Sequence, residues 1–282
     1  MSSYELGLYE KAMPGSLSMA QKLRAAKRAG YDYVEMSIDE TDEKLKRLEI
    51  SKEERLELIQ TMYEEGIMFR SICLSGHRKY SLGSPDPDME RRSLEIMEKA
   101  ITLADDLGIR TIQLSGYDVY YEEGNEGTRK RFEKNLLKAV QMAARHGVIL
   151  GFETMETEFM NTVKKAMKYV SLVDSTYLSV YPDIGNITNA AKLYHTSVED
   201  DIRCGKGHIC SMHLKETRPG VFREVPYGTG HVDFKEGIRT AWECGVRRYV
   251  TEFWDVGDEN WEEELAKAAK LMRGILDQCQ ED

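Results

Sequence analysis

Four residues with metal-binding side chains follow strand-like, apolar runs in the second half of the chain. Glu153 directly follows the apolar run VILGF. Asp183, His213 and Glu252 take the same position, at the ends of three later runs. A carboxylate beside a buried strand costs free energy unless it is paired or binds a metal ion. Three carboxylates and one imidazole suit Mn²⁺ or Mg²⁺, with Co²⁺ or Zn²⁺ as alternatives, so the pattern predicts one divalent cation at these residues.

The four runs belong to a regular alternation of strand-like and helix-like segments. In the helix that follows the strand at 68–75, Leu94, Met97, Ile101 and Ala104 recur at helical spacing. The helix-ending glycines, each just before the next strand, are Gly30, Gly66, Gly108, Gly147 and Gly245. Strands are expected at 4–10, 31–38, 68–75, 111–117, 148–155, 177–184, 208–216 and 248–254. Eight strands alternating with eight helices predict an α/β fold, a single (β/α)₈ TIM barrel domain over residues 1–282.

An open, doubly wound sheet is the alternative to this barrel. That fold usually has a glycine-rich phosphate loop after its first strand, and LYEKAMPGS is not such a loop. In a barrel the active site lies at the C-terminal ends of the strands. Because neighbouring strands lie about 4.8 Å apart, we expect the four metal-binding side chains to converge on one ion.

Composition restricts the partners of the chain. The net charge of −10 disfavours a phosphate-backbone partner, so no nucleic acid is expected. No apolar run reaches the 18 or so residues of a membrane span, and MSSYELGLYE lacks the features of a signal peptide. Five cysteines without a Cys-x-x-Cys spacing suit reduced thiols. These features predict a cytoplasmic protein.

Several longer stretches are similar to those of a known family. They are GLYEKAMP, VEMSIDETDE, LGSPD, IQLSGYDVYY, YPDIGN, HLKETRPGVF and VPYGTGHVDF. The chain resembles the xylose-isomerase-like barrel superfamily of metal-dependent sugar isomerases, epimerases and endonucleases. Within it, the chain resembles the L-ribulose-5-phosphate 3-epimerases of L-ascorbate utilisation, also called L-xylulose-5-phosphate 3-epimerases and formerly labelled hexulose-6-phosphate isomerases. His231 departs from this family's pattern, which has an apolar residue there.

The resemblance implies an isomerase-class enzyme that interconverts L-xylulose 5-phosphate and L-ribulose 5-phosphate. Glu153, Asp183, His213 and Glu252 fall on the metal ligands of the family. Glu153 and Glu252 double as the acid/base pair, which removes and returns the proton at C3 through a metal-stabilised enediolate. The expected partner is a small sugar phosphate, and a homodimer is compatible with the resemblance.

Further side chains are candidates for substrate contacts around this centre. Glu35 ends a strand-like run and has two interpretations, a contact to a substrate hydroxyl or a hydrogen bond behind the metal site. A glycine-containing loop, 217–231, is expected to close over the substrate. The rim candidates for the phosphate are His77, Arg78, Lys79 and Arg218, and the candidates for other contacts are Glu156, Glu158, Asn186, Lys215 and His231.

Three other functions fit parts of the pattern. An aldose–ketose isomerase would use the same metal site, but would move hydrogen between C1 and C2. A DNA endonuclease on this barrel would need several metals and a basic groove, which the net charge of −10 disfavours. A sugar-binding protein without catalysis would not need both glutamates.

Overall fold

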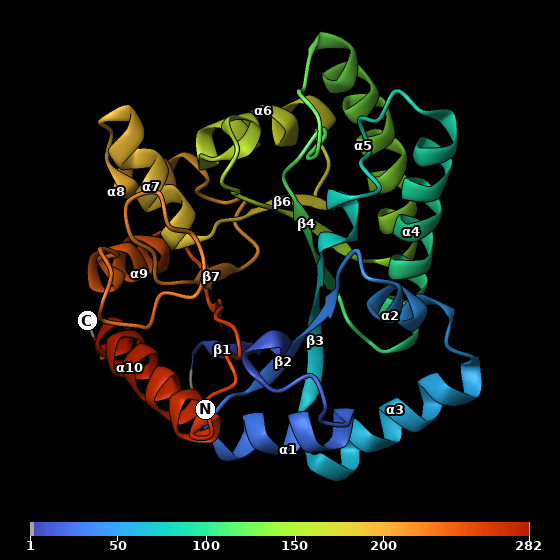
Figure 1. Ribbon diagram of the computed structural model, residues 1–282. Coiled ribbons are helices and arrows are strands. Elements are labelled where there is room, and N and C mark those ends of the chain that lie inside the picture. The colour runs from blue at the N-terminus through green and yellow to red at the C-terminus, as the bar shows by residue number, and fades with distance from the viewer. Residues whose placement is uncertain (1–2, 282) are drawn as a thin grey trace.

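The computed structural model describes residues 3–281. Its strands lie inside a ring of helices (Figure 1). The strands are β1 (Glu5–Tyr9), β2 (Tyr33–Ile38), β3 (Met68–Leu74), β4 (Thr111–Ser115), β5 (Ile149–Glu153), β6 (Leu178–Tyr181), β7 (Met212–Leu214) and β8 (Arg248–Thr251). The α-helices are α1 (Met19–Arg28), α2 (Asp42–Leu45), α3 (Lys52–Glu65), α4 (Pro87–Asp106), α5 (Glu126–His146), α6 (Val163–Val173), α7 (Ile184–Tyr194), α8 (Val198–Cys204), α9 (Phe234–Glu243) and α10 (Trp261–Glu281). Short 3₁₀ helices are η1 (Glu10–Ala12), η2 (Lys46–Glu49), η3 (Ser75–Arg78) and η4 (Glu158–Met160).

The eight strands form one parallel sheet in the order β6-β5-β4-β3-β2-β1-β8-β7. The first strand pairs with both β2 and β8, which brings the two ends of the chain together. The outermost strands, β6 and β7, meet only through isolated bridges, Val180 with Ile209 and Asp183 with His213. The sheet is therefore a nearly closed barrel, which confirms the predicted (β/α)₈ fold.

Several elements differ from their predicted bounds. The seventh strand was expected over 208–216, but β7 covers Met212–Leu214, because the preceding residues touch β6 only at a bridge. The sixth strand was expected to reach residue 184, but it ends at Tyr181. Pro182 has no N–H to extend the ladder, and Asp183 caps the start of α7. The short helices α2 and α8 are additional to the eight that were expected.

Alternation along the strands separates two apolar regions. On β5, Leu150 and Phe152 belong to the large core between the sheet and its helices. The neighbouring residues Gly151 and Glu153 point the other way, into the barrel, as the period of two requires. A smaller cluster fills the barrel interior, formed by Tyr9, Tyr33, Cys73, Tyr181 and Val250. Glu153 thus continues the inward-facing row of β5, and this geometry explains a charge directly after VILGF.

Glycine ends the helices where the chain must turn back into the barrel. Gly66 and Gly147 follow α3 and α5 with φ of 64° each, a left-handed conformation that glycine adopts at low cost. The other three predicted glycines, at 30, 108 and 245, also have positive φ. These turns let each strand begin soon after the preceding helix.

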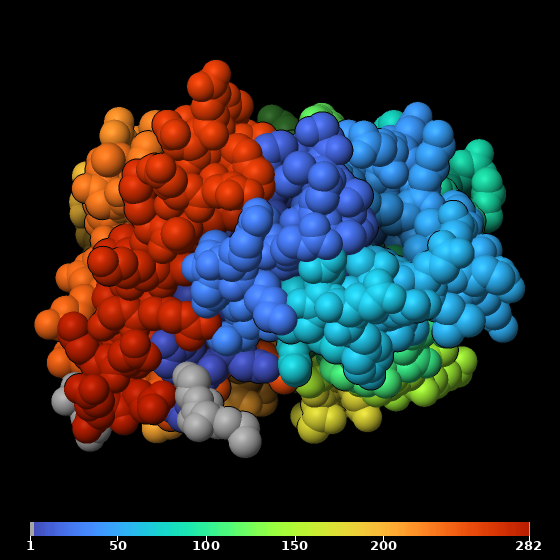
Figure 2. Space-filling view, turned by 90° about the horizontal axis from the view of Figure 1, so that it is seen from below, coloured from blue at the N-terminus to red at the C-terminus, as the bar shows by residue number. Residues whose placement is uncertain are grey.

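Both ends of the chain lie on the same side of the barrel. Helix α10 packs against β8, α9 and α1, and Figure 2 shows the first segments beside the last ones. Of the helices within residues 3–281, none has the length and apolar character that a bilayer span requires.

Candidate active site

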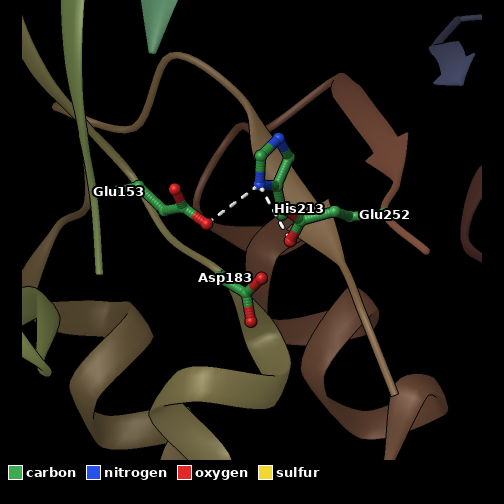
Figure 3. Close-up of side chains that lie close together, drawn as sticks. All are labelled: Glu153, Asp183, His213 and Glu252. Carbon is green, nitrogen blue, oxygen red and sulfur yellow. Dashed lines mark hydrogen bonds and ion pairs between the residues drawn. The ribbon is translucent and has the colours of Figure 1, made fainter. Parts of the chain in front are cut away.

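The four predicted metal ligands lie together at the C-terminal rim of the barrel. Glu153 ends β5, His213 lies in β7, and Glu252 directly follows β8. Asp183 opens α7, where its Oδ1 accepts a hydrogen bond from the backbone N–H of Asn186 at 2.7 Å. One ligand atom from each of the four residues lies within 4.8 Å of the others. Figure 3 shows Glu153 and Glu252 entering from opposite sides, with His213 and Asp183 between them.

Burial and neighbouring charges shift the pKa values of these carboxyl groups in different directions. Burial raises the pKa of Glu153, and the charge of Glu252 raises it further. Burial likewise places the pKa of Asp183 well above its ordinary value, although Lys215 opposes the shift. Burial also acts on Glu252, but Lys215 and His213 hold the pKa of that carboxyl well below its ordinary value. An acid/base pair uses this kind of difference between two carboxyl groups.

Lys215 brings a positive charge to the same cluster. Its Nζ lies 2.8 Å from Asp183 Oδ2 and 3.3 Å from Glu252 Oε2. Burial lowers the pKa of Lys215, but the carboxylates of Asp183, Glu252 and Glu153 raise it by more, so the net shift is upward. Lys215 therefore stays charged and offsets one of the three carboxylates.

Glu35 lies behind the cluster rather than in contact with a substrate cavity. Its side chain is fully buried, and its Oε1 lies 2.6 Å from His213 Nε2. The other ring nitrogen, His213 Nδ1, lies 3.3 Å from Glu153 Oε1 and 3.4 Å from Glu252 Oε2. Burial lowers the pKa of His213, but Glu35 and Glu252 raise it by more. Of the two interpretations of Glu35, the structure supports the hydrogen bond behind the site.

The cluster has the donors and the charge that a divalent cation needs. Asp183 Oδ2 and Glu252 Oε2 are buried, and among residues 3–281 they contact the charged groups of Lys215 and His213 without a well-formed hydrogen bond. When all three carboxyl groups are ionised they carry three negative charges, of which Lys215 would offset one and a divalent cation the other two. Oxygen-rich sets of this kind suit Mg²⁺ and Mn²⁺. The side chains therefore fit the predicted metal.

A cavity of about 70 Å³ opens above the cluster. Of the predicted residues, Arg78, Glu153, Glu156, Asn186, Lys215 and Glu252 line it. The guanidinium of Arg78 lies 5.0 Å from the centroid of the Tyr120 ring, and its buried Nε has no hydrogen-bond partner among the described residues. Glu156 accepts a hydrogen bond from the Tyr117 hydroxyl. The cavity thus joins the metal cluster to a cationic and aromatic rim.

The other predicted contact residues do not line this cavity. His77 Nε2 lies 2.9 Å from the Ser93 carbonyl oxygen in α4, and burial lowers the pKa of His77 to about 4. Lys79 is exposed, with its Nζ 5.2 Å from the centroid of the Tyr80 ring. Glu158 is also exposed, in η4.

Two more of these residues hold the loop 217–231 instead. Arg218 Nε donates to the Thr229 carbonyl at 3.1 Å. His231 Nε2 lies 3.1 Å from Thr217 Oγ1.

Several cavity residues were not anticipated from the sequence. Lys11 follows β1, Arg223 and Phe222 belong to the loop 217–231, and Trp254 follows β8; all of them line the cavity. Arg223 Nη2 lies 3.5 Å from Glu156 Oε1. Lys11 and Trp254 lie just beyond the C-terminal ends of strands, the same signal that led to the predicted metal ligands.

The loop 217–231 is held by a buried carboxylate, Glu216. Its Oε1 accepts hydrogen bonds from the backbone N–H groups of Thr217 and Val232, at 3.1 and 3.2 Å, and its Oε2 from that of Gly228 at 3.1 Å. These bonds join the two ends of the loop. Arg223, near its middle, is thereby placed over the cavity.

The fold and the cluster define a class of barrel proteins with a carboxylate–histidine site at the C-terminal rim. Residues 23–275 match the family model described as xylose isomerase-like TIM barrel, and the chain belongs to that family. The chain is 45% identical over 274 residues, 96% of this chain and 94% of the relative, to L-ribulose-5-phosphate 3-epimerase UlaE of Escherichia coli strain SE11.

Solved structures share the fold at lower sequence identity. The D-psicose 3-epimerase of Clostridium cellulolyticum H10, crystallised with D-tagatose, superposes with a TM-score of 0.80 at 18% identity, covering 96% of this chain and 99% of that one. An L-ribulose 3-epimerase superposes with a TM-score of 0.76 at 20% identity, covering 100% of this chain and 96% of the other. At these identities the structures support the barrel fold.

Proposed function

We propose that this protein is a metal-dependent sugar-phosphate 3-epimerase that interconverts L-xylulose 5-phosphate and L-ribulose 5-phosphate. The observation that carries the proposal is the pair Glu153 and Glu252, which line one cavity from β5 and from the end of β8. The relative at 45% identity, named as an L-ribulose-5-phosphate 3-epimerase, supports the choice of substrate.

The two glutamates can serve opposite faces of a bound ketose. One carboxyl group takes the proton from C3, next to the C2 carbonyl, and the other returns a proton to the opposite face. Each such transfer gains about 10²–10⁴-fold from a positioned group. Gln113 Nε2 donates to Glu153 Oε2 and orients it, while Lys215 keeps Glu252 ionised.

Removal of the C3 proton leaves negative charge on the sugar oxygens. Glu153, Asp183, His213 and Glu252 would hold a divalent cation, which would supply Lewis-acid stabilisation of that charge, worth several kcal/mol. Mn²⁺ or Mg²⁺ fits the three carboxylates best. Lys215, 2.8 Å from Asp183 Oδ2, balances the remaining charge of the cluster.

The cationic rim of the cavity is the proposed place of the substrate phosphate. Arg78, Arg223 and Lys11 line that rim, and guanidinium groups bind phosphate through paired hydrogen bonds. Asn186 and Glu156 line the same cavity and are the proposed contacts to the sugar hydroxyl groups.

The experiment that tests this function is a substrate panel on the purified protein after metal removal and add-back. L-xylulose 5-phosphate and L-ribulose 5-phosphate should interconvert, and the free ketoses should react far more slowly, because binding energy at the phosphate is used in the transition state. Equal kcat/KM for phosphorylated and free sugars would assign the chain to free-ketose epimerisation.

Formation of an aldose in the same panel would favour the aldose–ketose isomerase instead. The homodimer and the single domain stay predictions, and sedimentation analysis together with the cooperativity of unfolding tests them.

A further inference from the structure

We propose that Glu35 is a positioning residue of the metal centre, which holds His213 in the tautomer that presents Nδ1 to the cation. The proposal rests on the metal-binding part of the proposed function. It assigns a role to a side chain that the reaction itself does not use.

The depth of Glu35 in the barrel excludes a direct substrate contact. In the sheet register, Glu35 of β2 pairs with Ser71 of β3, and Ser37 pairs with Cys73. Cys73 lines the cavity, whereas Glu35 lies one inward-facing layer below it and is 0% exposed. A sugar in the cavity would be separated from Glu35 by this layer.

Both carboxylate oxygens of Glu35 already have hydrogen-bond partners. Its Oε2 accepts from Ser71 Oγ at 2.7 Å and from Tyr181 Oη at 2.8 Å. Its Oε1 lies 2.6 Å from His213 Nε2. Hydroxyl groups from β3 and β6 therefore orient the carboxylate, so that its remaining oxygen faces the imidazole.

A carboxylate oxygen accepts hydrogen bonds and donates none, so in the contact with Glu35 Oε1 the proton is carried by His213 Nε2. The lone pair of the neutral ring is then on Nδ1, which faces the carboxylates of Glu153 and Glu252 in Figure 3. Carboxylates behind metal-bound histidines orient the ring and increase its basicity in this way.

The aromatic neighbours of His213 limit its rotation but do not choose its tautomer. The Tyr181 ring lies edge-on, with its centroid 4.8 Å from that of the imidazole, and the Tyr9 ring is at 6.4 Å. Neither ring accepts the Nε2 proton. Glu35 is therefore the group that determines which nitrogen the cation meets.

The test compares Glu35→Gln with a matched control, Tyr181→Phe, using Zn²⁺ alone as the probe. Affinity is measured by competition with a chromophoric chelator, and the tautomer is read from the ¹⁵N shifts of His213 in Zn²⁺-loaded, ¹⁵N-histidine-labelled protein. Glu35→Gln should weaken Zn²⁺ binding by ~10–100-fold and shift the His213 nitrogen signals. Tyr181→Phe, which removes one bond to Glu35 but keeps the ring beside His213, should change both far less.

Glu35→Leu extends the test, because it removes the acceptor altogether and should weaken Zn²⁺ binding at least as much as the glutamine variant. Wild-type affinity and ¹⁵N shifts in Glu35→Gln would overturn the proposal. A loss of Zn²⁺ affinity in Glu35→Gln with unchanged ¹⁵N shifts of His213 would overturn it too, because the effect would then not act through the imidazole. A wild-type protein that binds no Zn²⁺ would overturn the metal centre itself and this role of Glu35 with it.

Discussion

Replacing the two glutamates one at a time gives the sharpest view of how the site works. Glu153→Gln and Glu252→Gln keep the shape of each side chain but remove its ability to accept a proton. Loss of one positioned acid/base group lowers the rate by about 10²–10⁴-fold, which corresponds to roughly 2.7–5.4 kcal/mol of activation free energy. Epimerisation should fall by that amount in each variant.

The structure predicts that the two variants differ in metal retention. Gln113 donates its amide to Glu153, and the buried Oε1 of Gln113 has no hydrogen-bond partner among the described residues. Turning this amide over gives the new glutamine an acceptor, so Glu153→Gln should keep its metal. Glu252 is instead 3.3 Å from Lys215 Nζ, and removing its charge leaves the cation of Lys215 less balanced. Glu252→Gln should therefore bind metal more weakly.

The assay is ¹H NMR in D₂O with each epimer in turn, after the metal content of every sample has been measured. Wild-type enzyme should place deuterium at C3 during inversion. Each variant should exchange the C3 proton of one epimer without inverting it, and the two variants should choose opposite epimers. Near-normal epimerisation in both metal-loaded variants would refute the two-glutamate mechanism, and label at C1 with aldose formation would indicate an isomerase.

Three further predictions test the surroundings of the site. Arg223→Met should lower kcat/KM for the ketose phosphate by about 10–150-fold, the worth of one charged hydrogen bond, while the control Lys79→Met, whose exposed side chain does not line the cavity, should not; equal effects would remove Arg223 from the phosphate site. Gly230→Ala should impair the same kinetics, because a Cβ there would lie 2.2 Å from Glu216 Oε1 and from the Thr217 carbonyl oxygen, whereas Gly15→Ala meets nothing within 4 Å and serves as its control. Glu10→Gln should cost about 3–5 kcal/mol of unfolding free energy at pH 7, since it leaves Lys22, Lys44 and Arg47 without their buried carboxylate. Burial raises the pKa of Glu10, but Arg47, Lys22 and Lys44 outweigh it and hold that pKa well below its ordinary value. The stabilisation is therefore complete above about pH 4.3 and is lost as the pH falls through the lower folded pKa. Urea unfolding of Glu10→Gln and of the control Glu5→Gln, at pH 7 and at pH 3, measures it, and equal losses of unfolding free energy in both variants would contradict it.

The barrel and the four-residue cluster were predictable from local sequence patterns. Strand alternation has a period of two, so the residue that ends an inward-facing row is determined within a few positions of the chain. Parallel strands also end at the same rim. Glu153, Asp183, His213 and Glu252 could therefore be assigned together without knowledge of their contacts.

Loop side chains were the part that local patterns did not predict. His77 follows the C-terminal end of β3, where a side chain is expected at the rim of the barrel. Its ring is nevertheless buried and faces Ser93 of α4. Arg223 was overlooked, although the bonds of Glu216 bring its loop over the cavity. The direction of such a side chain depends on partners that lie far away in the sequence.

The sequence by itself thus determined which residues end the strands, and so which side chains meet at the rim. Only the tertiary structure decided which side chains lie behind these four residues and which ones line the cavity above them. Glu35 and His213 are 178 positions apart, and they meet because closure of the sheet brings β2 and β7 to face each other across the barrel. Contacts across a closed barrel arise from the sum of all strand pairings, so no single segment of sequence encodes them.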